Sequence, residues 1–360
     1  MKIVNIILTS QKGGAEQVFI DYLKAFKKLG HEVFSIIKSD APYEAKVNKL
    51  SSKVRKTTNS LGFYDFIAVR NIKKFLEEFD ANVVFAHTGR ATKLTRDAIA
   101  KIKNKKIFLV SINHSMNVKR SIGADVVLSV NKEIFYKTID AGQEENKSFI
   151  MHNATDLDDA IEVVAPLDFE KKSEIILGVM GRFDEIKAFH FAIEAIAKLN
   201  KISSEKKLNK EFLLKIAGSG PQESFLRKLV IELNLQNEVE FLSWVEDKKI
   251  FFSSIDIFCL TSMRETFGLV LLEAMKYRKP IISTNADGPK EILRDKVDAI
   301  LVEINPLKSL PDRIVEASLE IVSDSNLANK MVQNSFLRLK KEFSFSSLED
   351  RLKEIVGIVK

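Results

Sequence analysis

The sequence predicts an α/β protein with two doubly wound, Rossmann-like domains, each built on a parallel sheet. Its 360 residues, 45% hydrophobic and 29% charged, are enough for two globular domains with separate cores. Apolar, strand-like runs alternate with amphipathic helical stretches, which is the pattern of βαβ units. The alternation begins at residue 2 and begins again at residue 174.

The first domain is predicted over residues 1–155. It opens with a strand at 2–9, a glycine turn at 10–14 (Ser-Gln-Lys-Gly-Gly), a helix at 15–29 closed by Gly30, and a strand at 31–38. The turn lacks both the G-x-G-x-x-G fingerprint and the Walker lysine pattern. The sequence therefore argues against a dehydrogenase or a nucleoside triphosphatase.

The rest of this domain is predicted as helical patterns over 41–80, clearest at 64–79, and then strands at 83–87, 107–114, 124–130 and 147–152. His87 and His114 end two of these runs. The carboxyl ends of parallel strands face the ligand crevice of an open α/β sheet, so both are candidate site residues. A lone histidine is more often structural, and that alternative stays open.

A linker is predicted at 156–172, a second domain at 173–345 and a final helix at 346–360. The second domain contains expected strands at 174–180, 212–217, 239–242, 255–260, 280–283 and 299–302. Asp156-Leu157-Asp158 spells a D-x-D triplet, which we interpret as linker and not as a metal site. No metal and no cofactor are expected.

Charge is unevenly distributed along the chain. Residues 1–150 hold 26 Lys and Arg against 15 Asp and Glu, a net charge of +11, whereas the remaining 210 residues hold 30 against 34, a net charge of −4. Solvated surface lysines are one explanation and an anionic membrane surface is another, with a basic patch at Lys53, Arg55, Lys56, Arg70, Lys73 and Lys74. Nucleic-acid binding has only the charge to recommend it.

Composition also bounds the location of the chain. The single cysteine, Cys259, excludes an internal disulfide and the usual cysteine-rich zinc site. No apolar run has the 18 or so residues of a membrane helix, and the first strand lacks the pattern of a signal peptide. The expectation is a cytoplasmic protein, with peripheral association at the inner face of the cell membrane as a further hypothesis.

Residues 262–275 carry the strongest functional pattern. They follow an apolar strand and lead into a helix, so the first amides of that helix, at Thr266, Phe267, Gly268 and Leu269, are placed to bind a diphosphate. Glu265 and Glu273 stand on either side of this stretch, and carboxylates bind vicinal hydroxyls. The pattern suits a nucleotide sugar. A buried helix with an acid near its N-terminus is the alternative.

The segment Glu265-Thr266-Phe267-Gly268-Leu269-x-x-x-Glu273 resembles the E-x7-E signature of retaining glycosyltransferase family 4, of the glycosyl transferases group 1, which have the GT-B fold. Three further motifs support the resemblance, in order along the chain. They are Gly13-Gly14-Ala15-Glu16, His114, and Gly181-Arg182 with Lys187, where Ala188 replaces the usual glycine.

The resemblance implies two domains with a cleft between them and a final helix that returns to the first domain. It places the donor on Gly13, Gly14, Arg182, Lys187, Glu265, residues 266–269 and Glu273, and the acceptor near Glu16 and His87. His114, Glu265, Arg182 and Lys187 are the implied catalytic residues.

The implied reaction is metal-independent transfer of a hexosyl or N-acetylhexosaminyl unit, with retention, from a nucleotide-sugar donor to a hydroxyl of a glycan or lipid-linked acceptor. Lipopolysaccharide, capsule and glycolipid biosynthesis are the expected settings. Two rivals remain, which are a sugar-nucleotide epimerase on the same fold and a non-catalytic glycan- or nucleotide-binding scaffold.

Overall fold

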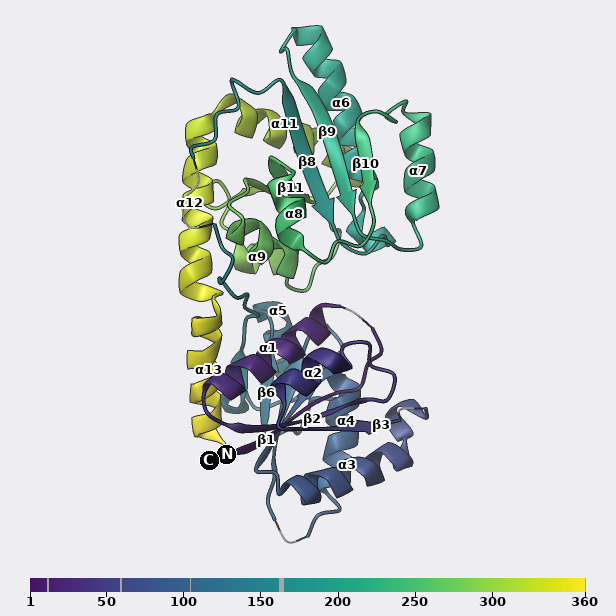
Figure 1. Cartoon of the computed structure of the whole chain (residues 1–360), viewed down its shortest axis with the longest axis vertical. Helices are drawn as coiled ribbons and strands as arrows, with labels where there is room; N and C mark the ends of the chain where they lie inside the picture. The colour runs from purple at the N-terminus through teal and green to yellow at the C-terminus, as the bar shows by residue number, and fades with distance from the viewer. Residues whose placement is uncertain (12, 59, 104, 162–164, 360) are drawn as a thin grey trace. The chain divides into compact units, whose positions relative to one another are not determined.

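The computed structural model describes residues 1–11, 13–58, 60–103, 105–161 and 165–359 (Figure 1). Lys12 of the glycine turn, residues 162–164 of the expected linker and Lys360 of the last helix lie outside the described residues. The chain divides into two compact units. Unit 1 comprises Met1–Thr155 and Phe343–Lys360, and unit 2 comprises Asp156–Glu342.

Unit 1 is built on a seven-stranded sheet in the order β3-β2-β1-β4-β5-β6-β7, with all neighbours parallel. The strands are β1 (Lys2–Ile7), β2 (Glu32–Lys38), β3 (Lys53–Thr57), β4 (Val83–His87), β5 (Phe108–Asn113), β6 (Val126–Ser129) and β7 (Ser148–Ile150). The helices are α1 (Gly14–Lys28), α2 (Glu44–Leu50), α3 (Phe66–Phe79), α4 (Thr88–Ile99), α5 (Lys132–Asp140) and α13 (Phe345–Ile358). Short 3₁₀ turns are η1 (Gly62–Tyr64) and η2 (Glu145–Lys147).

Unit 2 is built on a six-stranded parallel sheet in the order β10-β9-β8-β11-β12-β13. The strands are β8 (Glu174–Met180), β9 (Glu211–Ala217), β10 (Val239–Leu242), β11 (Ile257–Leu260), β12 (Ile281–Thr284) and β13 (Ile300–Val302). The helices are α6 (His190–Lys206), α7 (Glu223–Glu232), α8 (Lys248–Ser253), α9 (Leu269–Lys276), α10 (Asp287–Ile292), α11 (Leu310–Ser323) and α12 (Ser325–Glu342). Two 3₁₀ turns are η3 (Glu185–Lys187) and η4 (Leu307–Ser309).

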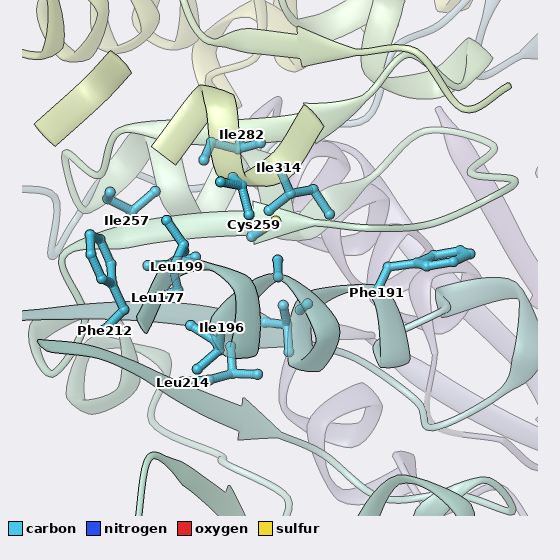
Figure 2. Close-up of a cluster of buried hydrophobic side chains, with 14 of the residues drawn as sticks. Leu177, Phe191, Ile196, Leu199, Phe212, Leu214, Ile257, Cys259, Ile282 and Ile314 are labelled. Atoms are coloured by element: carbon cyan, nitrogen blue, oxygen red, sulfur yellow. The ribbon is translucent and has the colours of Figure 1, made fainter. Parts of the chain in front are cut away.

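The two doubly wound sheets confirm the predicted fold class. Central strands such as β4 are buried along their whole length, because helices cover both faces of a parallel sheet. The core of unit 2 joins strand residues such as Leu177 and Ile257 to α6 and α11 (Figure 2). Cys259 lies in this core, where burial raises the pKa of its thiol to about 12, as expected for a structural residue.

The order of strands reverses once in each sheet. In unit 1 the reversal falls between β1 and β4, and in unit 2 between β8 and β11. Helices that follow these two strands leave on opposite sides, so the loops at the carboxyl ends of the pair diverge and leave room for a ligand. The topology therefore selects the loops after β1 and β4 in unit 1, and those after β8 and β11 in unit 2.

The last helix belongs to unit 1 although it follows all of unit 2 in the sequence. Thr155 forms a parallel bridge with Ser344, and its amide donates to the carbonyl oxygen of Phe343 (3.0 Å). Beyond this point α13 packs on α1. Lys28 of α1 forms a salt bridge with Glu349 (2.9 Å), and the ammonium group of Lys24 lies over the ring of Phe345. None of the described helices is long and apolar enough to cross a membrane.

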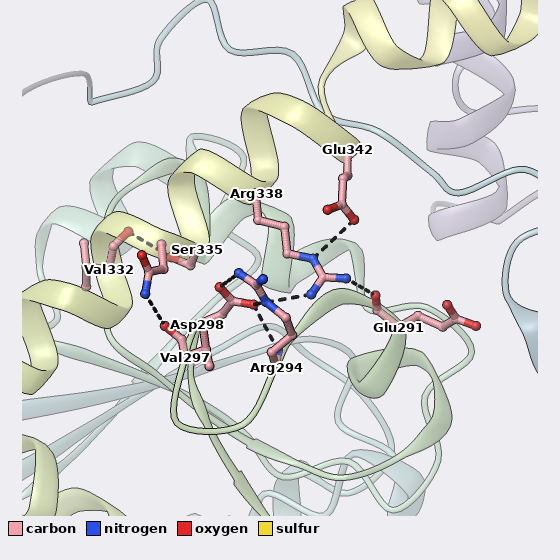
Figure 3. A network of polar contacts seen from close by, with 9 residues as sticks. Glu291, Arg294, Val297, Asp298, Val332, Ser335, Arg338 and Glu342 are labelled. Atoms are coloured by element: carbon pink, nitrogen blue, oxygen red, sulfur yellow. Dashed lines mark hydrogen bonds and ion pairs between the residues drawn. The ribbon is translucent and has the colours of Figure 1, made fainter.

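A buried carboxylate fixes α12 to the rest of unit 2 (Figure 3). Asp298 accepts hydrogen bonds from Arg294 (2.7 and 2.8 Å) and lies 3.4 Å from Arg338 of α12. Arg338 also donates to the carbonyl oxygen of Glu291 (3.0 Å) and pairs with Glu342. Each charge of this cluster has an opposite partner, as a buried carboxylate requires.

Candidate active site

A pocket of about 480 Å³ opens at the carboxyl end of the unit 1 sheet, where the strand order reverses. Its walls come from the loops after β1 and β5, the end of β2, the first turn of α4, and η1. The described lining residues are Leu8, Thr9, Ser10, Gln11, Lys38, Phe63, Thr88, Gly89, Arg90, Asn113, His114, Ser115, Asn117 and Arg120. His114 is the predicted catalytic residue among them.

A hydrogen-bonded relay lies behind His114. Its Nε2 is 3.0 Å from Nδ1 of His87, whose own Nε2 is 3.0 Å from Oδ1 of Asn5. The Asn5 amide donates to the carbonyl oxygen of Phe19 (3.0 Å), which turns its oxygen toward His87. The two imidazole rings are stacked, with centroids 5.2 Å apart.

The relay fixes one tautomer of each ring. Because Asn5 presents an oxygen, His87 must carry its proton on Nε2 and accept on Nδ1, so His114 donates from Nε2. Nδ1 of His114 then carries the lone pair, and the ring offers the pocket a hydrogen-bond acceptor. Burial and the adjacent His114 hold the pKa of His87 well below its ordinary value, and burial lowers the pKa of His114 to about 4. Both rings are neutral at pH 7.

Two residues predicted at the acceptor do not line this pocket. His87 is fully buried at the end of β4, and Glu16 is buried in the first turn of α1. Glu16 accepts a hydrogen bond from Thr9 (2.5 Å), and a side chain on Gly13 would meet its carboxylate at 3.0 Å. Their surroundings favour roles beneath the site, in which His87 orients His114 and Glu16 fixes the turn that contains Gly13 and Gly14.

In unit 2 the loop after β8 lies directly on the loop after β9. The amide of Phe183 donates to Ser219 (2.9 Å), and a Cβ on Gly218 would lie 1.9 Å from the carbonyl oxygen of Gly181. A Cβ on Gly220 would likewise clash with the backbone of Phe183. These glycines were not predicted as site residues.

Ala188, which replaces the family's usual glycine, adopts the conformation that a glycine favours. Its backbone is left-handed, with φ 50° and ψ 41°, and its methyl group is buried. The turn that places Lys187 is therefore retained without the glycine. The side chain of Lys187 packs on Gly181, where an added Cβ would lie 3.7 Å from the lysine Cε.

The two predicted glutamates each hold a lysine. Glu265 forms a salt bridge with Lys187, and Glu273 lies 2.6 Å from Lys248 at the start of α8. Between them lies Gly268, the residue before α9, which has a φ of 100°. Because glycine has no side chain, it cannot cap the first amides of the helix. The predicted loop and helix start are confirmed as backbone geometry.

Two other residues complete this loop. The amide of Gly288 donates to the carbonyl oxygen of Glu265 (2.9 Å), and a Cβ on Gly288 would lie 2.5 Å from that oxygen. Thr261 donates to the carbonyl oxygen of Lys187 (2.7 Å), which joins the β11 loop to the β8 loop. Arg182 is 65% exposed and pairs with Asp184, so of the two predicted cations only Lys187 contacts Glu265.

Four of the six cations in the basic patch predicted around α3 have carboxylate partners, and the other two, Arg70 and Lys74, are exposed. Lys53 and Arg55 both bind Glu78, whose pKa these cations lower to about 2. Lys56 pairs with Glu44 and Lys73 with Glu77. Large apolar side chains are exposed beside the pocket instead, at Leu61, Tyr64, Phe66 and Ile67.

The Asp156-Leu157-Asp158 triplet lies against α9. Lys276, whose side chain is 5% exposed, binds Asp156 (3.0 Å) and Asp159, and Tyr277 donates to Asp159. Asp156 is therefore used to fix the first residues of unit 2, in agreement with the linker interpretation.

Comparison with known proteins supports a group 1 glycosyltransferase and the GT-B fold. The family described as "Glycosyl transferases group 1" matches residues 165–338. The chain is 24% identical over 96% of its length to the lipopolysaccharide core biosynthesis glycosyltransferase LpsE of Rhizobium meliloti, of which it covers 96%.

Solved structures with the same fold include HepE of Anabaena in complex with UDP-glucose, with a TM-score of 0.82, 20% identity and 99% of both chains covered. Another is the lipopolysaccharide outer core galactosyltransferase WaaB, with a TM-score of 0.76, 17% identity and 99% of both chains covered. The chain is therefore a glycosyltransferase with the GT-B fold, in which residues 165–338 match the family described as "Glycosyl transferases group 1".

Proposed function

We propose that the protein is a retaining, metal-independent glycosyltransferase of family 4 that binds a nucleotide-sugar donor on unit 2 and an acceptor hydroxyl on unit 1. The observation that carries the proposal is the loop between Glu265 and Glu273. It joins two carboxylates, each held by a lysine, to the start of α9, where Gly268 supplies no side-chain cap. Carboxylates suit sugar hydroxyls, while the amides and Lys187 suit a diphosphate.

In the proposed reaction, the bond between the anomeric carbon and the diphosphate breaks while the acceptor oxygen bonds to the same face of that carbon. The acceptor proton passes to the departing diphosphate oxygen. Arg182, Lys187 and the amides at residues 266–269 stabilise the charge that develops on the leaving group. Glu265 orients the sugar, Glu273 binds the ribose, and the neutral His114 accepts a hydrogen bond from a hydroxyl of the reacting sugars.

The relatives indicate which substrates to try first. LpsE and WaaB are named for lipopolysaccharide core synthesis, and HepE was solved with UDP-glucose. We propose UDP-hexoses as donors and a glycan or lipid-linked acceptor of the lipopolysaccharide type, used at the cytoplasmic side. For such an acceptor we place peripheral membrane contact at the exposed apolar side chains Leu61, Tyr64, Phe66 and Ile67, because most cations of the patch around α3 are held in ion pairs.

A nucleotide-sugar panel scored by thermal unfolding tests the proposal. A true donor present at 100 times its dissociation constant stabilises the protein by roughly 2.7 kcal/mol. Lys187→Ala should weaken binding of the nucleoside diphosphate by at least about tenfold, because a charge-assisted contact is lost. The matched control is Lys201→Ala, a lysine on the exposed side of α6 that pairs with Glu205.

Activity distinguishes the remaining alternatives. Transfer should survive excess EDTA, and a complete loss restored by a divalent ion would contradict metal independence. Interconversion of nucleotide sugars without an acceptor would favour the epimerase, and tight donor binding without any turnover would favour the scaffold.

A further inference from the structure

The pocket of unit 1 is lined by cations and by no described carboxylate. Lys38, Arg90 and Arg120 lie in its wall, and none of the described lining residues is Asp or Glu. Lys38 is compensated by Asp40, 2.9 Å away. A pocket for a neutral sugar would be expected to hold carboxylate acceptors for hydroxyl groups, as unit 2 does at Glu265 and Glu273.

Both arginines lie over one aromatic ring. The guanidinium carbon of Arg120 is 4.8 Å from the ring centroid of Phe63, and that of Arg90 is 5.5 Å from the same centroid. Phe63 belongs to η1 and lines the pocket itself. Stacking on an aromatic ring uses the face of a guanidinium, whereas its edge is the part that binds phosphate or carboxylate through two parallel hydrogen bonds.

The backbone around Arg120 is fixed from three directions. Its carbonyl oxygen accepts from Arg96 (2.7 Å), and the neighbouring Ser121 accepts from the buried Asn113 (2.9 Å). Its side-chain stem rests on Gly89, where a Cβ would lie 3.0 Å from Cβ of Arg120. The side chain is therefore placed by the fold.

Arg120 differs from the cations of unit 1 that are held in ion pairs. Lys53, Arg55, Lys56, Lys73, Lys93 and Lys105 each have a carboxylate partner. Within the described part of the chain, the guanidinium of Arg120 contacts a ring and pairs with no carboxylate. Its charge is thus not neutralised where it lines the pocket.

We propose that the acceptor carries an anionic group, a phosphate or carboxylate, which binds at Arg120 and Arg90 over Phe63. This inference rests on the proposed function, since it names the substrate class of the acceptor pocket. It assigns to unit 1 an anion subsite separate from the diphosphate site proposed on unit 2.

Binding of two probes to the full-length protein, with the donor site saturated by UDP, tests the subsite. The probes are glucose 6-phosphate in solution, with glucose as the neutral comparison, and phosphatidic acid in phosphatidylcholine vesicles. We expect Arg120→Gln to weaken binding of a phosphate probe by at least about tenfold. Lys119→Gln, a neighbouring exposed lysine outside the pocket lining, should change it less than twofold. Phe63→Leu keeps an apolar side chain and should weaken binding to a smaller extent.

The outcomes separate the possibilities. A loss confined to glucose 6-phosphate assigns a soluble anionic acceptor, and a loss confined to the vesicles assigns a lipid-linked one. Equal binding of glucose and glucose 6-phosphate together with unchanged vesicle binding in Arg120→Gln overturns the proposal, as does a phosphate probe that binds only when UDP is left out. Failure of the proposed function has a different signature, because UDP and nucleotide sugars would then not bind at all.

Discussion

The proposed role of His114 depends on His87 and Asn5, which lie behind it and do not line the pocket. This dependence gives a prediction at the level of single side chains. Asn5→Leu removes the oxygen that holds the proton of His87 on Nε2, so His87 and His114 lose their fixed tautomers. We expect nitrogen NMR shifts of labelled histidine to show a single neutral Nε2–H form of His114 in the wild type and a mixture in the variant. Transfer should slow by about tenfold.

Asn5→Asp serves as the conservative comparison, because its carboxylate still accepts from His87 Nε2 and should restore the tautomer. Donor affinity should be unchanged in both variants, since the proposed donor site lies on unit 2. A slower enzyme with an unaltered tautomer would show that the relay is structural only.

The lowered pKa of His114 also makes the stability of unit 1 depend on pH. The folded value of about 4 lies below the unfolded value of about 6.5, so the unfolded chain binds the proton first as pH falls. Stability is fully present above pH 6.5 and is lost toward pH 4. The loss should reach at most about 2 kcal/mol at pH 5. Urea unfolding at pH 7 and pH 5 should show a smaller difference for His114→Gln than for the wild type.

At the level of loops, Gly288 is the residue on which the Glu265 loop depends. Gly288→Ala would place a Cβ 2.5 Å from the carbonyl oxygen of Glu265 and 2.6 Å from the amide of Phe267. Both contacts are to backbone, so the loop must move. We expect donor affinity to fall by at least about tenfold and stability by roughly 1–3 kcal/mol.

Gly357→Ala is the matched control for this substitution. It lies in α13, where an added Cβ has nothing within 4 Å, and alanine favours a helix by up to about 1 kcal/mol. Calorimetric titration with UDP measures the first effect and urea unfolding the second. Wild-type affinity in Gly288→Ala would mean that the loop does not bind the donor.

Most strands and helices could be predicted from apolar periodicity, but β3 could not. Its residues, Lys53–Thr57, include three basic side chains and only one apolar side chain, Val54, at an edge of the sheet, and they lie among helical patterns. The motif residues of the site were likewise found in the sequence. Their partners Lys248, Asn5 and Gly288 were not, because each is brought to its place by tertiary folding from a distant segment.

At the level of a whole unit, Asp298 should be essential for holding α12. Asp298→Asn leaves Arg338 without its buried partner and should cost about 2–4 kcal/mol in the urea unfolding of unit 2. Asp287→Asn, at an exposed pair with Lys290, should cost less than about 1 kcal/mol. Similar losses for both variants would show that the cluster in Figure 3 adds no stability.

Unit 1 is built from two segments of the chain that are separated by all of unit 2, and this has a consequence for biosynthesis. The ribosome completes every residue of unit 2 before it makes α13, the helix that covers α1. Unit 2 is continuous and can fold as it emerges, whereas the nascent unit 1 must wait with one face of α1 uncovered. A chaperone that recognises apolar surface on nascent chains should therefore bind the face of α1 that α13 later covers, until α13 is released from the exit tunnel.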